Sequence, residues 1–259
     1  MKYYSFAAML IFAISCSIPT EKASDGFASV PESPARKMSF EVASTVALSK
    51  EDPDCKSGEC ASIEISYPEL SELNRVNDFV EDKVREVVAD FTRKNKRSDD
   101  ISDLMTIFIK DFKAYKEAFP ESIAPWYVNV EARVEFGNDQ FYSVRIDQES
   151  YTGGAHTNTY RSYFLIDNSG RPMALTEIVV DKNALASIAE KKFRRLKKLG
   201  SDTKLSEAGY MFDNDQFDLS ENVGFTSRGM IIFYNDYEIG SHADGPTEVF
   251  LSWGEIESI

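Results

Sequence analysis

The clearest pattern in the chain is the alternation of apolar and more polar residues between Trp126 and Phe136. A period of two predicts a β-strand with one buried face and one face in water. The turn-forming run Gly137-Asn138-Asp139 follows, so a hairpin with a second strand over Phe141–Asp147 is expected. A third strand is predicted over Tyr160–Asp167.

Helical spacing of apolar residues predicts three long helices elsewhere in the chain. The first begins near Pro68, the second is capped by Asp99 or Asp100, and the third runs from about Asp181 to Leu199. Further strands are predicted over Phe40–Leu48, Ser62–Ser66, Val223–Ser227, Met230–Tyr234 and Thr247–Leu251. Because helices and hairpins are segregated along the sequence, we predict an α+β fold in which antiparallel sheet hairpins pack with three long helices.

The N-terminus has the pattern of an export signal. Lys2 precedes an uncharged stretch from Tyr3 to Ile14, which is shorter than the roughly 20 apolar residues needed to span a bilayer. Residues 1–15 are therefore predicted to be a signal peptide. The pair Ser15-Cys16 resembles the lipobox of bacterial lipoproteins and predicts lipidation of Cys16, with ordinary cleavage as the alternative. The composition of residues 16–37 predicts a disordered tether.

The net charge and the cysteines are compatible with an exported protein. The net charge of −14 argues against nucleic acid or an anionic membrane surface as the main partner. It favours cationic partners, or serves solubility alone. Cys55 and Cys60 are expected to form a local disulfide in an oxidising compartment. We therefore predict an exported protein of the bacterial cell envelope, periplasmic or surface-exposed, that is anchored to a membrane by its N-terminal lipid.

Three motifs in the second half of the chain belong together. They are Tyr151-Thr152-Gly153-Gly154-Ala155-His156-Thr157-Asn158, Leu175-Thr176-Glu177-Ile178, and Tyr237-Glu238-Ile239-Gly240 followed by Gly245-Pro246. This set resembles the RsiV/PdaC-like extracellular domain of unknown function. Tyr67-Pro68 entering a helix resembles the module that often precedes that domain. The resemblance predicts an N-terminal helical and strand module over residues 38–122 and an RsiV/PdaC-like domain over residues 123–259.

The resemblance implies an envelope domain with a binding role. In the anti-sigma factor RsiV this domain is associated with recognition of lysozyme, a strongly basic enzyme, and an acidic chain is compatible with such a partner. The expected sigma-binding segment and the deacetylase domain of PdaC have no counterpart in this sequence. Neither anti-sigma signalling nor deacetylation is therefore carried over from the resemblance.

Two glycine-containing loops supply the candidate binding residues. Paired glycines allow positive φ and close approach of the backbone, which suits a ligand loop as well as a tight bend between strands. The predicted binding residues are Tyr151, Gly153, Gly154, His156, Asn158, Tyr237, Gly240 and Gly245. A metal site would have to join His156, His242 and a carboxylate such as Asp244, but no spacing of the HExxH kind brings them together.

The sequence contains no GxSxG elbow, phosphate-binding glycine loop or dinucleotide fingerprint. No catalytic residue, cofactor or metal is therefore predicted. The leading hypothesis is a non-enzymatic binding module for an envelope protein of the lysozyme type or for a cell-wall glycan. The alternatives are a metal-assisted hydrolase or deacetylase-type accessory acting on cell-wall glycans, and a structural envelope protein without a small ligand.

Overall fold

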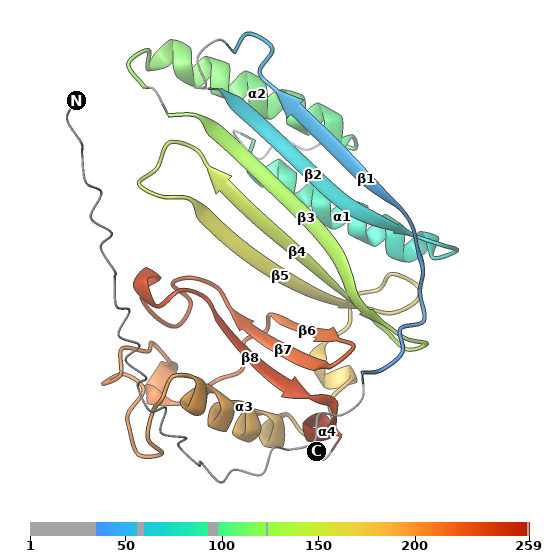
Figure 1. Cartoon of the computed structure of the whole chain (residues 1–259), viewed down its shortest axis with the longest axis vertical. Helices are drawn as coiled ribbons and strands as arrows, with labels where there is room; N and C mark the ends of the chain where they lie inside the picture. The colour runs from blue at the N-terminus through green and yellow to red at the C-terminus, as the bar shows by residue number, and fades with distance from the viewer. Residues whose placement is uncertain (1–34, 56–59, 93–97, 123, 258) are drawn as a thin grey trace, which may run out of the picture. The chain divides into compact units, whose positions relative to one another are not determined.

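The larger part of the fold is a five-stranded sheet with the strand order β1-β2-β3-β4-β5 (Figure 1). The computed structural model describes residues 35–55, 60–92, 98–122, 124–257 and 259. Neighbouring strands are antiparallel except for β2 and β3, which are parallel. The strands are β1 (Val42–Glu51), β2 (Ala61–Leu70), β3 (Trp126–Gly137), β4 (Tyr142–Tyr151) and β5 (Asn158–Ile166).

Two helices connect β2 to β3 and cover one face of this sheet (Figure 1). They are α1 (Asn74–Asp90) and α2 (Ile101–Ala118). A parallel pair needs such a crossover connection, because a tight turn can only join antiparallel strands. The side chain of Asp100 accepts a hydrogen bond from the Ser102 amide at 2.7 Å, which confirms the predicted cap of the second helix. The apolar residues of both helices pack on the alternate residues of β2, β3 and β4 that face them.

The predicted start of the first helix at Pro68 is wrong. Pro68 lies inside β2, opposite Thr45 of β1, and α1 begins only at Asn74. A proline is tolerated here because β2 pairs with β3 only as far as Ser66, so no ladder hydrogen bond from residue 68 is missing. The Tyr67-Pro68 motif therefore belongs to the end of a strand.

The smaller part of the fold is a three-stranded antiparallel sheet covered by one helix. The strands are β6 (Val223–Thr226), β7 (Gly229–Tyr234) and β8 (Thr247–Ser252), and the helix is α3 (Lys182–Leu196). Leu185, Ala189 and Phe193 of α3 are fully buried against this sheet. The short helix α4 (Trp253–Ile256) follows β8, and single 3₁₀ turns lie at Leu175–Glu177, Asp213–Asp215 and His242–Asp244.

The α+β fold class is confirmed, with one parallel strand pair added to the predicted antiparallel hairpins. The described residues belong to one compact unit, and the five-stranded sheet runs across the division predicted after residue 122. Cys55 and Cys60 form the expected disulfide, with their Cα atoms 5.5 Å apart. Cys16, the predicted signal peptide and most of the predicted tether lie outside the described residues. Among the helices that the structure describes, none is long and apolar enough to cross a membrane.

Candidate functional site

The face of the five-stranded sheet that points away from α1 and α2 is polar. Strand periodicity puts odd-numbered residues such as Asn129 and Asp147 on this face. Even-numbered residues are buried under the helices, among them Val128, Val130, Val144 and Ile146. The strand register then aligns polar side chains into rows across the sheet. One row joins Glu64, Asn129 and Glu149, and the next joins Ser66, Glu131 and Asp147.

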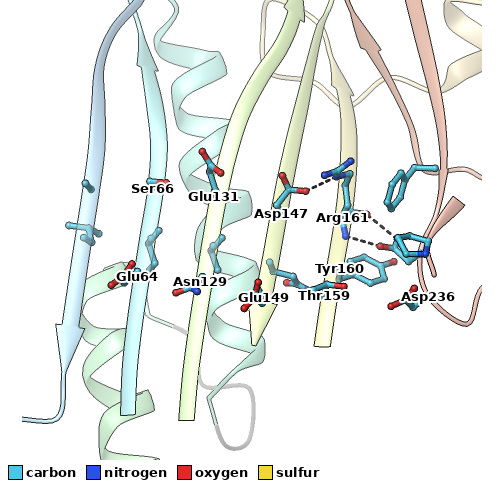
Figure 2. Close-up of a pocket in the computed structure, with 18 of the residues that line it drawn as sticks. Glu64, Ser66, Asn129, Glu131, Asp147, Glu149, Thr159, Tyr160, Arg161 and Asp236 are labelled. Carbon is cyan, nitrogen blue, oxygen red and sulfur yellow. Dashed lines mark hydrogen bonds and ion pairs between the residues drawn. The ribbon is translucent and has the colours of Figure 1, made fainter. Parts of the chain in front are cut away.

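A groove of about 680 Å³ lies over these rows (Figure 2). Its floor is formed by β1 to β5, and its far wall comes from the end of β7 and the loop that follows. The wall residues are Phe233, Asn235, Asp236 and Pro246. The groove is therefore built from segments that are distant in the sequence.

The groove has a surplus of negative charge. The Asp147 carboxylate is neutralised by Arg145 at 2.9 Å and by Arg161 at 2.6 Å, and Glu131 pairs with Arg133 at 2.6 Å. By contrast, Glu64 and Glu149 are exposed and form no ion pair within the described part of the chain. Two carboxylates of one row are thus available to a cation.

Two asparagine side chains attach the wall of the groove to the edge strand β5. The Asn235 amide is buried; its oxygen accepts from the Arg161 backbone N–H at 2.7 Å, and its nitrogen donates to the Arg161 carbonyl at 3.0 Å. Asn222 accepts from the Tyr163 backbone N–H and donates to the same Arg161 carbonyl, both at 2.7 Å. The two amides therefore bond to backbone groups of β5 that would otherwise be free to pair with a sixth strand.

The two predicted ligand loops meet at one end of the groove. The imidazole rings of His156 and His242 stack with their centroids 4.5 Å apart, and the Tyr237 ring stacks on His242 at 5.3 Å. Asp236 Oδ2 lies 3.2 Å from His242 Nδ1. A pocket of about 420 Å³ beside this stack shares Gln148, Thr159, Tyr160 and Asp236 with the groove. The groove and the pocket therefore share part of their lining at the edge strand β5.

A tyrosine marks the junction of the two cavities. Tyr160 lines both of them and is 45% exposed. Partial burial, and the nearby negative charge of Glu238, raise the pKa of the Tyr160 phenol. The phenol is therefore a neutral hydroxyl near pH 7 and can donate a hydrogen bond to a ligand.

The predicted binding residues fall into three groups. His156, Asn158 and Tyr237 line the pocket. Gly153 and Gly245 have positive φ values of 87° and 64° and serve the loop backbone. The other three do not line the pocket: Tyr151 packs its ring near Tyr127 of the neighbouring strand, Gly154 is exposed, and Gly240 is buried beside Asp244. The binding role of all eight stays a prediction.

Internal contacts hold Asp244, the carboxylate considered for a metal site, and two basic side chains of α3. Asp244 accepts from Ser241 at 2.6 Å and does not contact either histidine ring in the described contacts. No group of three His, Cys, Asp or Glu side chains arranged to hold a metal ion occurs among the described residues. On α3, Lys192 pairs with Glu255 at 2.8 Å and Arg194 with Glu190 at 2.8 Å.

The acidic rows were not predicted from the sequence, although part of the signal is present. The alternation in β3 identifies Asn129 and Glu131 as residues of a solvent-facing strand surface. It does not say which side chains of β2 and β4 lie beside them, because that depends on register. The two asparagines that fix the wall lie in irregular segments, where asparagine is a common turn residue.

Two protein families and two solved structures are similar to this chain. The family described as "Deacetylase PdaC" matches residues 55–159, and the family described as "Protein of unknown function (DUF3298)" matches residues 177–254. A DUF3298 family member from Bacteroides fragilis NCTC 9343 superposes with a TM-score of 0.64 at 19% identity, covering 86% of this chain and 94% of its own. A DUF3298 family protein from Pseudomonas aeruginosa PAO1 gives 0.57 at 17% identity, covering 87% and 95%. No curated protein matches the chain.

The fold and these matches define an α+β domain class whose function is not established. The chain has a PdaC-like region followed by a DUF3298-like region. The resemblance seen in the sequence is thereby confirmed. The two solved structures show that the fold is shared, and the name of the deacetylase describes PdaC alone.

Proposed function

We propose that the chain is a non-enzymatic binding module of the bacterial envelope that holds a basic protein of the lysozyme type in its groove. The observation that carries this proposal is the row formed by Glu64, Asn129 and Glu149, in which two exposed carboxylates have no cationic partner in the described chain. Complementary charge speeds the encounter of such partners and fixes their orientation. A lysine or arginine side chain entering the groove would find a carboxylate without a cationic partner on either side of Asn129.

The cellular location of the module is part of the proposal. A signal peptide over residues 1–15, lipidation of Cys16 and the tether to residue 37 would hold the groove near a membrane surface. Labelling with radioactive palmitate tests this, because incorporation is expected in the natural chain and should be lost with Cys16→Ser. Equal labelling of both chains would contradict lipid attachment at this cysteine.

The direct test is calorimetric titration with lysozyme at two salt concentrations. The variant Glu64→Gln/Glu149→Gln should weaken binding about tenfold or more, equivalent to roughly 1.4 kcal/mol. Higher salt should weaken binding of the natural chain, because both carboxylates are exposed. The control Glu81→Gln/Glu117→Gln removes the same charge from exposed positions of α1 and α2, behind the sheet, and should leave the affinity nearly unchanged.

Two results would contradict the proposal. One is the absence of binding at lysozyme concentrations well above micromolar. The other is an equal loss of affinity in the groove variant and in the control, which would mean that only the net charge matters.

A cell-wall glycan is the second candidate ligand, and a separate observation favours it. Tyr237 is 59% exposed and extends the stack of His242 and His156 into a flat aromatic surface beside the pocket. Flat aromatic rings pack against the apolar faces of sugars. Titration with muropeptides should therefore show binding that is lost with Tyr237→Ala and kept with Glu64→Gln. Muropeptide binding that is unchanged in Tyr237→Ala would contradict this assignment.

A further inference from the structure

The two edge strands of the five-stranded sheet, β5 and β1, differ in whether other segments of the chain bond to their outer backbone groups. At β5, the amides of Asn222 and Asn235 bond to backbone groups of the edge. At β1, the outermost strand on the other side, no described segment pairs with the free edge (Figure 1). An open edge of ten residues is a template for another strand, and natural proteins normally protect such edges.

The hydrogen bonds around β1 show which backbone groups face outward. The Asp52 N–H donates to the Ala61 carbonyl at 2.9 Å, next to the registered pair of Glu51 and Ser62. Bonded and non-bonded positions alternate along an antiparallel pair. Thr45, Ala47 and Ser49 therefore direct their N–H and C=O groups away from β2, and they are exposed.

We propose that two copies of the chain pair through β1 in antiparallel orientation, with the two-fold axis at Ala47. The segment matches itself in this register. Thr45 lies opposite Ser49 of the second copy, where both side chains are small and neutral. Val46 lies opposite Leu48 of the second copy, so two half-buried apolar side chains cover each other on both sides of the axis.

The strand itself carries no charge that would oppose a second copy at this edge. Residues 42–49 contain no charged side chain, although the whole chain has a net charge of −14. Lys50 falls opposite Ser44 of the second copy, so no like charges face each other along the pair. The repulsion between the two acidic bodies acts at longer range and is screened over roughly 8 Å at physiological ionic strength. Pairing should therefore strengthen as salt is added.

The pairing would change the surface on which the proposed ligand lies. The side chains of Ala47 and Ser49 form part of the groove floor. A second β1 beside them would join the two grooves across one continuous ten-stranded sheet. The dimer stands independently of the proposed ligand, because it rests on the edge of the sheet alone.

The test is the mass of the full chain in solution, measured by sedimentation equilibrium over a range of concentrations at low and high salt. The natural chain should approach the mass of two copies, more readily at high salt. Ala47→Pro removes one outward N–H and should leave a monomer, since proline is tolerated on an edge strand whose N–H faces solvent. The matched control Ala47→Val keeps the N–H and should still form dimers.

A second pair of variants keeps the test decisive if Ala47→Pro does not fold. Thr45→Lys/Ser49→Lys places the introduced cations opposite each other across the axis and should prevent pairing. Thr45→Lys/Ser49→Glu places opposite charges there and should restore it. A natural chain that stays monomeric at all concentrations and salt conditions, or a dimer that none of these substitutions weakens, would overturn the proposal.

Discussion

Replacing Asn235 with alanine tests whether side-chain amides hold the groove wall on the edge strand. The Asn235 side chain makes three contacts at 2.7–3.2 Å, two with the backbone of Arg161 and one with Glu238. Its removal leaves the Arg161 N–H without an acceptor in a partly buried position, which costs about 1–3 kcal/mol. The Arg161 carbonyl keeps its bond to Asn222. We therefore expect the free energy of unfolding to fall by about 2–3 kcal/mol.

The assay is urea unfolding with linear extrapolation to water. The two tryptophans report on different regions, because Trp126 lies in the core of the five-stranded sheet and Trp253 in the core beneath α3. Asn168→Ala is the control: Asn168 is exposed and donates one 3.2 Å bond, so its loss should cost less than about 0.5 kcal/mol. A difference between Asn235→Ala and the natural chain below 0.5 kcal/mol would refute the structural role assigned to this amide.

Two further predictions concern packing and pH. Gly224→Ala should destabilise the fold by about 1–3 kcal/mol in the same urea assay, because the added methyl group would collide with the buried Tyr163 ring; an unchanged midpoint would contradict this. Hydrogen bonds from Ser169 and Arg171 lower the Asp167 pKa from 3.8 to about 2. The stability lost in Asp167→Asn should therefore be full above about pH 4 and should disappear as the pH falls through 2. A pH-independent difference would exclude this cause.

Local patterns in the sequence predicted most of the elements but little of their pairing. The alternation that starts at Trp126 and the cap at Asp100 depend on near neighbours, so both were recognisable. The end of β2 was missed because Leu70 and Leu73 fit the helical spacing of the residues that follow. The parallel alignment of β2 with β3 depends on a crossover, which no local pattern specifies.

The sequence predicted the loops of the candidate site but not the sheet residues that form the floor of the groove. The glycine-rich and aromatic motifs identified the segments around His156 and Tyr237, and the structure brings these segments together. The acidic row of Glu64 and Glu149 exists only because β3 places Asn129 between them. Such a row depends on register, and a one-residue shift would turn these side chains toward the helices.

The parallel pairing of β2 with β3 also has a consequence for the order in which the protein is made. Fifty-five residues separate Leu70, the end of β2, from Trp126, the start of β3. At roughly 5–20 residues per second, the ribosome takes roughly 3 to 11 s to deliver the strand that β2 needs. During that interval the β1–β2 hairpin has two open edges. Unpaired strand edges of this kind are prone to aggregation until β3 closes one of them.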